Sequence, residues 1–172
     1  ALKRKLGKKG DDVWLSTTSR LVKKNAVDDV IKSLPLLPEK ITFLILGIGP
    51  DETMLKNLAR ELGVEKRVLF VGQVGHADMP AYLHVSDIFI RPSLSEGMGS
   101  SFVEAMAAGL PVIATPVGGI VDFLKDGETG LFCEVRNPQS IATIVSRLYA
   151  DDDLKNTLVR TARELVREKY DW

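Results

Sequence analysis

The sequence predicts an α/β fold in which a parallel β-sheet carries helices on both faces. Three observations support this prediction. Short apolar runs alternate along the chain with longer segments of helical spacing. These runs are nearly continuous rather than alternating with polar residues, as expected for strands buried on both faces of a parallel sheet. With 172 residues, of which 45% are hydrophobic, the chain is large enough to bury a core.

Six apolar runs have the length of β-strands. They occupy residues 13–18, 41–46, 68–71, 88–90, 112–114 and 130–133. Right-handed crossovers between successive parallel strands give a doubly wound sheet. In such a sheet, ligands bind beyond the carboxyl ends of the strands. The loops expected at that edge are 19–26, 47–52, 72–77, 91–99 and 115–120.

Apolar residues spaced by three and four positions predict the helices between these strands. The groups with this spacing are Val27, Val30, Ile31 and Leu34; Met54, Leu55, Leu58 and Leu62; Ile141, Ile144, Val145 and Leu148; and Leu154, Leu158, Ala162 and Leu165. A further helix is predicted to begin at His76 and to end near His84. Neither histidine has a second ligand at metal-binding spacing, so both are interpreted as structural.

Composition and charge argue against several classes of protein. The formal net charge is zero, with 23 basic and 23 acidic residues, so no overall field draws the chain onto nucleic acid. Cys133 is the only cysteine, which excludes a disulfide framework and a cysteine-based metal site. No apolar run reaches the roughly 18 residues of a membrane span. We therefore expect a domain with no membrane span and no nucleic-acid partner.

The loop after the fourth predicted strand has the residues of an anion site. Gly97 and Gly99 let the backbone approach a ligand closely. The helix that begins near Ser100 presents free N–H groups and the positive end of its dipole. Glu96 lies in this loop and Glu104 lies two turns further on. Carboxylates accept hydrogen bonds from sugar or ribose hydroxyls, although a solvated loop acid and a surface ion pair fit the residues equally well.

The run from Glu96 to Glu104 resembles the E-x7-E motif of the retaining glycosyltransferases of the GT-B fold, in particular the GT4 family. The flanking residues agree with that family. Residues 92–99 read PSLSEGMG and resemble PS-x-x-E-G-F-G, and residues 104–114 read EAMAAGLPVIA and resemble E-A-M-A-x-G-x-P-V-V-A. The similarity is essentially free of gaps over about residues 43–141. It implies the Rossmann-like C-terminal domain of a GT-B enzyme.

The resemblance also implies roles for the residues of this motif. Glu96 would contact hydroxyls of the transferred sugar and act in catalysis, and Glu104 would hold the ribose of the nucleotide. The backbone positions that would meet the sugar and the distal phosphate are Met98, Gly99 and Ser100, followed by the helix start at Ser101. The family usually has an aromatic residue in place of Met98, so the shape of the pocket is expected to differ there.

The loop at 19–26 resembles the family segment G-R-L-x-x-x-K-G, in which an Arg and a Lys clamp the diphosphate and offset the charge of the leaving group. Arg20 matches this Arg, whereas Asn25 and Ala26 stand in place of the Lys and the Gly. Two interpretations stay open. Lys24 reaches the phosphate from one residue earlier, which we favour, or Asn25 makes a neutral contact.

Two further loops are expected on the nucleobase side of the site. In the family, the positions of Gly47 and Gly49 line this side, although a tight turn before the next helix explains both glycines equally well. Backbone groups of Gly72, Gln73 and Val74 would wrap the base. Backbone recognition leaves little trace in side chains, so the sequence does not distinguish uracil, guanine and adenine.

The resemblance implies a division of the chain and a role for the parent enzyme. Residues 1–10 would be the remnant of a linker from a missing N-terminal domain, and residues 11–172 the nucleotide-sugar-binding Rossmann-like domain. The full enzyme would transfer a hexose from a nucleoside diphosphate sugar to an acceptor hydroxyl, with retention at the anomeric carbon. The acceptor would be a glycan or a lipid, in polysaccharide or glycolipid biosynthesis.

Several expectations accompany this interpretation. Family members generally need no metal or other cofactor, and the full enzyme is expected in the cytoplasm, including the inner face of the membrane. The isolated chain is expected to bind nucleotide without catalysing transfer. Two alternatives remain open: a sugar-nucleotide 2-epimerase of the same fold, and a nucleotide-binding module without catalysis, which only the departures at Asn25 and Ala26 favour.

Overall fold

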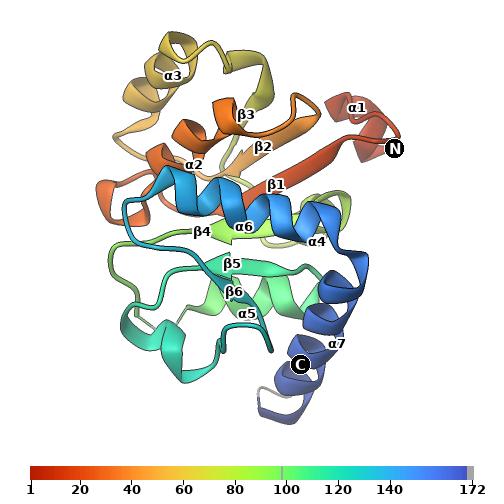
Figure 1. Ribbon diagram of the computed structural model, residues 1–172. Helices are drawn as coiled ribbons and strands as arrows, with labels where there is room; N and C mark the ends of the chain where they lie inside the picture. Colours follow the sequence, from red (N-terminus) through yellow and green to blue (C-terminus); the bar gives the residue numbers. More distant parts are fainter. Residues whose placement is uncertain (98, 170–172) are drawn as a thin grey trace.

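The computed structural model describes residues 1–97 and 99–169, and it confirms the predicted α/β fold (Figure 1). One six-stranded sheet has the order β3-β2-β1-β4-β5-β6, and all neighbouring strands are parallel. The strands are β1 (Val13–Thr18), β2 (Ile41–Leu46), β3 (Val68–Gly72), β4 (Ile88–Arg91), β5 (Val112–Ala114) and β6 (Leu131–Phe132).

Helices cover both faces of this sheet (Figure 1). The α-helices are α1 (Leu2–Leu6), α2 (Val27–Ser33), α3 (Glu52–Glu61), α4 (Met79–Val85), α5 (Ser100–Ala107), α6 (Pro138–Ala150) and α7 (Asp152–Lys169). The short 3-10 turns are η1 (Lys23–Asn25), η2 (Leu34–Leu36), η3 (Glu65–Arg67) and η4 (Gly118–Asp122). The predicted alternation of strands and helices is therefore present.

Alternate residues of the central strands face the two layers of helices. On β2, Phe43 and Ile45 are fully buried in the core beneath α2, α3 and α6. Leu44 and Leu46 point to the opposite face, toward Trp14 and the helices α1 and α4. Successive side chains of a strand point to opposite faces, so a strand covered on both sides must be apolar throughout. This is why β2 reads as a continuous apolar run.

The strand order creates a switch point between β1 and β4. The chain first builds outward from β1 through β2 and β3, then returns to the other side of β1 with β4, β5 and β6. The connections after β1 and after β4 therefore leave toward opposite faces of the sheet. They part at the carboxyl ends of the two strands, near Thr18 and Arg91, which is where doubly wound sheets bind ligands.

Residues 1–10 contain a helix that the sequence pattern did not predict. Leu2 and Leu6 of α1 pack against the core around Trp14. Next to this helix, Lys8 Nζ lies 2.7 Å from Asp87 Oδ2, and only 7% of the Lys8 side chain is exposed. This segment is thus part of the folded unit; that it derives from an interdomain linker stays a prediction.

The boundaries of four elements differ from the predicted ones, and two of these, β3 and β4, simply end one residue later than predicted. The helix α4 begins at Met79 rather than at His76. Pro80 occupies its first turn, where a missing N–H costs no helical hydrogen bond, and His76 belongs to the preceding turn. The last strand is only two residues long, Leu131–Phe132, instead of the predicted 130–133.

Candidate functional site

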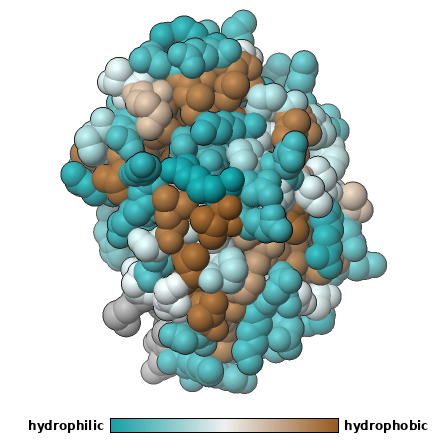
Figure 2. All heavy atoms as spheres, turned by 60° about the vertical axis from the view of Figure 1, so that its left-hand side comes forward, coloured by the Kyte–Doolittle hydropathy of each residue, from teal (hydrophilic) through white to brown (hydrophobic). Residues whose placement is uncertain are grey.

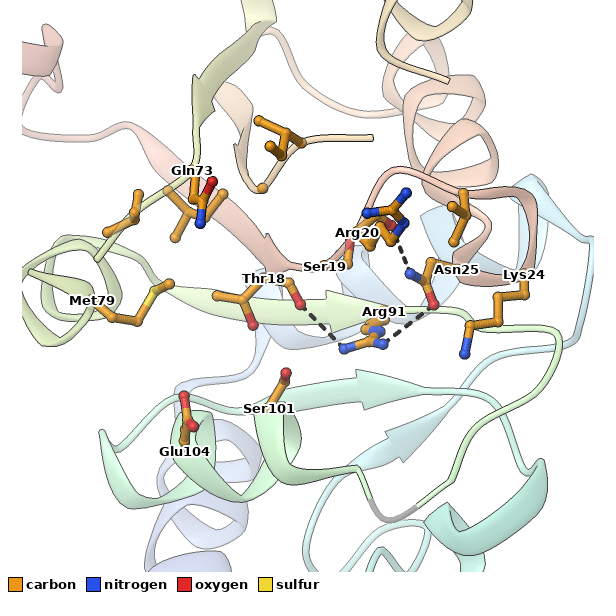
Figure 3. Close-up of a pocket in the computed structure, with 15 residues that line it drawn as sticks. Thr18, Ser19, Arg20, Lys24, Asn25, Gln73, Met79, Arg91, Ser101 and Glu104 are labelled. Carbon is orange, nitrogen blue, oxygen red and sulfur yellow. Dashed lines mark hydrogen bonds between the residues drawn. The ribbon is translucent and has the colours of Figure 1, made fainter. Parts of the chain in front are cut away.

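A cavity of about 600 Å³ lies at the switch point, beyond the carboxyl ends of β1, β2 and β4 (Figure 3). Its volume is typical of a small-molecule site. The lining residues are Thr18, Ser19, Arg20, Val22, Lys24 and Asn25 from β1 and its loop; Leu46, Gly47 and Ile48 from β2 and its loop; Gln73, Val74 and Met79 beyond β3; and Arg91, Ser101 and Glu104 from β4 and α5.

The carboxyl edge of the sheet also carries exposed apolar side chains. Ile48, Val121 and Val135 follow β2, β5 and β6, and each is between 41% and 48% exposed. The side on which the strand arrows end in Figure 1 comes forward in Figure 2, which shows apolar patches among polar ones. The surroundings of the site are therefore chemically mixed rather than uniformly charged.

The loop after β1 supplies one wall of the cavity. Arg20 and Lys24 are exposed and line it, whereas Asn25 is buried at the end of η1. The Asn25 amide Nδ2 donates to the backbone carbonyl of Arg20 at 2.7 Å, which closes the loop on itself. Ala26 follows with φ 52°, a left-handed conformation that favours glycine. The conformation of Ala26 is thus one in which a glycine, the residue of the resembling motif at this position, would be less strained.

Arg91 ends β4 and reaches across the switch point. Its Nη1 donates to the carbonyl of Thr18 at 3.2 Å, and its Nη2 donates to Asn25 Oδ1 and Glu96 Oε1, both at 3.3 Å. The guanidinium carbon also lies 5.7 Å from the ring centroid of Phe102. Burial lowers the pKa of Arg91 while the charge of Glu96 opposes this shift, and an arginine remains protonated in either case.

Glu96 is not a solvated loop acid. Only 8% of its side chain is exposed. Ser93 Oγ donates to Glu96 Oε2 at 2.8 Å, and Arg91 Nε lies 3.3 Å from the same oxygen. Thr115 in turn donates to the backbone carbonyl of Ser93 at 2.5 Å. The carboxylate is therefore held behind Arg91 and is not among the residues that line the cavity.

The helix α5 supplies the facing wall. Gly99 precedes it in a left-handed conformation with φ 68°. Ser101 and Glu104 both line the cavity, because residues three apart share one face of a helix. Gly99 and Ser100 are not among the lining side chains, although they stand at the helix start. Met98 lies outside the described residues.

Two glycines in the loop after β2, which was predicted to face a nucleobase, allow this loop to touch the loop after β1. A Cβ on Gly47 would lie 1.8 Å from the carbonyl oxygen of Ser19, and a Cβ on Gly49 would lie 2.5 Å from that of Leu21. Only glycine permits this approach. Gly47 lines the cavity; Gly49 does not, so a packing role explains Gly49.

Beyond β3, the cavity takes in only part of the predicted nucleobase segment. Gln73 and Val74 line it, and Gly72, at the end of β3, does not. Met79, at the start of α4, completes this side.

The cavity combines positive charge with polar groups that can receive a ligand. Arg20, Lys24 and Arg91 bring three cations to it, and Glu104 adds one acid on the opposite wall (Figure 3). The hydroxyls of Thr18 and Ser19 are buried and have no hydrogen-bond partner within the described part of the chain. Buried polar groups are normally hydrogen-bonded. The arrangement can bind an anion together with a ligand rich in hydroxyls.

Arg91, Thr18 and Met79 line this cavity but were not predicted as site residues. Arg91 could have been predicted from the sequence, because it ends a buried strand five positions before Glu96. Burying an arginine there costs free energy unless it has a partner. Thr18 and Met79 carried none, because a strand-end threonine and a helical methionine are common in any core.

Other chemistries find no support in residues 1–97 and 99–169. Within these ranges no three His, Cys, Asp or Glu side chains are grouped as metal ligands. No described helix combines the length and the apolar character needed to span a bilayer. Cys133 is buried, and burial raises the pKa of its thiol to about 12, which removes the thiolate needed for reactivity.

The same architecture occurs in solved structures. This chain is similar to the Anabaena protein HepE in complex with UDP-glucose, with a TM-score of 0.93 and 25% identity. The match covers 98% of this chain and 47% of the HepE chain. This chain is also similar to the C-terminal domain of the group 1 glycosyl transferase LpcC from Francisella tularensis, with a TM-score of 0.83 and 26% identity over 92% of this chain and 86% of that domain.

Sequence comparison agrees with the fold. An uncharacterized glycosyltransferase of Methanocaldococcus jannaschii is 31% identical over 99% of this chain and 44% of its own length. The N-acetyl-alpha-D-glucosaminyl L-malate synthase of Bacillus anthracis is 32% identical over 98% of this chain and 44% of its own length. The chain thus spans less than half the length of these relatives. The model of the family described as glycosyl transferases group 1 matches residues 1–165, and the chain belongs to this family.

Proposed function

We propose that this domain binds the nucleoside diphosphate sugar donor of a retaining glycosyltransferase of the GT4 type. The observation that carries the proposal is the cavity at the switch point, where Arg20 and Lys24 lie opposite Ser101 and Glu104. Cations on one wall suit a diphosphate. An acid on the other wall, at the first turns of a helix, suits the hydroxyls of a ribose. Relatives support the nucleotide class, since HepE is described in complex with UDP-glucose.

Within this proposal, the diphosphate lies between the loop after β1 and the start of α5. Arg20 contacts it, Lys24 adds charge from the exposed end of the loop, and the amides that follow Gly99 meet the distal phosphate. Negative charge grows on the leaving diphosphate as the bond to the sugar breaks. Fixed positive groups stabilise that charge in the transition state, and this is the catalytic role of Arg20 and Lys24.

The remaining site residues divide by the part of the donor that they would meet. Glu104 holds the ribose. Glu96 is assigned to the hydroxyls of the transferred sugar, and its carboxylate, held by Arg91 and Ser93 outside the cavity lining, would have to turn toward the bound donor. The nucleobase lies against the loops after β2 and β3. The residues assigned there are Gly47, Gly49, Gly72, Gln73 and Val74.

The parent enzyme is proposed to be longer than this chain. Its curated relatives are about twice as long, which suits a preceding domain joined through residues 1–10. That domain would supply the acceptor site, and the isolated chain would bind donor without transferring the sugar. Similar proteins include a mycobacterial phosphatidylinositol mannosyltransferase and a glycogen synthase. A role in glycolipid or polysaccharide assembly in the cytoplasm, including the inner face of the membrane, is proposed on this basis.

Nucleotide titration of the chain tests the binding proposal. UDP-, GDP- and ADP-glucose are added in turn while backbone amide resonances and the melting temperature are followed. One of the three is expected to bind, to shift amides of Gln73, Val74 and α5, and to bind at least tenfold more weakly to Arg20→Ala, because a hydrogen bond to a charged group is lost. If none of the three binds, the proposed function is wrong.

Product analysis of the full-length enzyme tests the mechanism. Transfer with the anomeric configuration of the donor kept in the product is expected, and Glu96→Ala is expected to abolish it. An inverted product would refute retention. An epimerised donor formed without acceptor would favour a 2-epimerase. Wild-type transfer rates in Glu96→Ala would remove the proposed catalytic role of Glu96, and a full-length protein that transfers no sugar would favour a module without catalysis.

A further inference from the structure

Arg91 is a buried cation to which the family motif gives no role. It follows the apolar residues of β4 and precedes Pro92. Only 11% of its side chain is exposed, yet it lines the cavity at the switch point. Burying an arginine in a small domain costs free energy unless the charge has partners. Glu96 partners this charge, but that pair does not explain why the guanidinium lines the cavity.

The guanidinium joins three separate parts of the site. It donates to the backbone carbonyl of Thr18 at 3.2 Å, to Asn25 Oδ1 at 3.3 Å and to Glu96 Oε1 at 3.3 Å. Figure 3 shows it in the middle of the cavity wall, between Thr18 and Asn25 and above Ser101. The charge is thus central in the site rather than at its rim.

Asn25 does not supply charge and cannot replace a lysine. Its Nδ2 is engaged with the carbonyl of Arg20 at 2.7 Å, and its Oδ1 accepts from Arg91. Lys24 is exposed, so solvent and salt screen its charge. The guanidinium of Arg91, by contrast, is hydrogen-bonded to the side chain of Asn25 and is largely shielded from solvent.

Arg91 also retains hydrogen-bonding capacity for a ligand. A guanidinium has five N–H donors, and three hydrogen bonds to side chains and backbone are formed. Its Nε lies 3.3 Å from Glu96 Oε2 but is not aligned for a hydrogen bond and has no such partner in the described part of the protein. The N–H group left for a ligand is therefore the second one on Nη1, from which a phosphate oxygen can accept a charge-assisted hydrogen bond.

We propose that Arg91 provides the second positive charge for the diphosphate of the donor, in place of the lysine whose position Asn25 occupies. Asn25 and Glu96 orient its guanidinium from two sides. This inference rests on the proposed function. On this proposal Arg91, rather than Asn25, supplies the charge of the missing lysine, and Lys24 adds a smaller contribution to the diphosphate because solvent screens its charge.

The test compares a nucleoside diphosphate with its monophosphate on the same variants. Whichever of UDP, GDP and ADP binds the wild-type chain most tightly is used, together with UMP, GMP or AMP of the same base. Arg91→Gln is expected to weaken the diphosphate roughly 10- to 100-fold and the monophosphate by less than about threefold. Lys24→Gln is the matched control and is expected to lose less diphosphate affinity, with an effect that fades in high salt.

A charge exchange separates an electrostatic role from a structural one. Adding Asn25→Lys to Arg91→Gln restores a cation at the same place and is expected to recover most of the diphosphate affinity. Should Arg91→Gln fail to fold, Arg91→Lys takes its place in the test. Lysine keeps the positive charge but lacks the planar guanidinium, so the variant is expected to lose less affinity, and only for the diphosphate.

Three results would overturn the inference. Equal losses for diphosphate and monophosphate would mean that Arg91 acts only through packing. Unchanged diphosphate binding in Arg91→Gln would remove its role altogether while leaving the proposed function intact. If the wild-type chain binds none of UDP, GDP and ADP, the proposed function fails and this inference fails with it.

Discussion

Gly118, the first residue of η4, allows the loop after β5 to touch the loop that carries Glu96. Its φ is +53°, and a Cβ built on it would lie 2.0 Å from the backbone carbonyl oxygen of Glu96. The next residue, Gly119, donates its N–H to the same oxygen at 3.3 Å. Ordinary contact begins near 3.4 Å, so Gly118→Ala must push the Glu96 backbone away by more than about 1 Å.

Two costs add in this variant. A left-handed conformation costs a non-glycine residue about 1–2 kcal/mol, and crowding a packed site costs about 1–3 kcal/mol more. The expected loss in free energy of unfolding is therefore about 2–5 kcal/mol. Moving Glu96 also disturbs its 2.8 Å contact with Ser93. If Glu96 acts in catalysis as proposed, a shift of about 1 Å can lower the rate roughly 100-fold.

Gly127→Ala is the matched control. Gly127 has φ +82° and no atom within 4 Å of a built Cβ, so it carries the conformational cost of about 1–2 kcal/mol without the clash. Urea unfolding of the chain gives both free energies, and the sugar transfer proposed for the full-length enzyme gives both rates. If the two variants lose the same stability and the same activity, the contact between Gly118 and Glu96 has no role.

Two further predictions concern charged groups away from the cavity. Burial, and to a smaller extent the charge of Asp28, raises the pKa of Asp29 above 3.8. The folded state therefore binds the proton more tightly than the unfolded state, and the free energy of unfolding falls as pH rises from 3.8 through the folded pKa. Asp29→Asn is expected to remove this decrease when urea unfolding is measured against pH, and an unchanged slope would refute the prediction. Lys8→Met breaks the ion pair with Asp87 and is expected to lower the free energy of unfolding by about 1 kcal/mol in the same assay, because Asp87 is partly exposed. Lys9→Met, at an exposed position, is the control and should leave the free energy of unfolding unchanged. Equal losses in the two variants would mean that the pair does not hold α1 in place.

Most of the fold follows from local patterns in the sequence. The run of β2 is apolar throughout because both of its faces are covered, and the spacing of Ile141, Val145 and Leu148 marks the one buried face of α6. The helix α1 escaped prediction because five residues are too few to show a period. Its packing is decided by Trp14 and by Asp87, which lie elsewhere in the sequence.

The site divides in the same way. The sequence by itself determined that an acid and a helix start follow β4, since the spacing from Glu96 to Glu104 is a property of one continuous segment. Only the tertiary structure decided that Glu104 lines the cavity while Glu96 is held behind Arg91. The direction of a buried side chain depends on the partners that surround it. For Arg91 those partners come from two other parts of the chain, β1 and η1, and no local pattern records their approach.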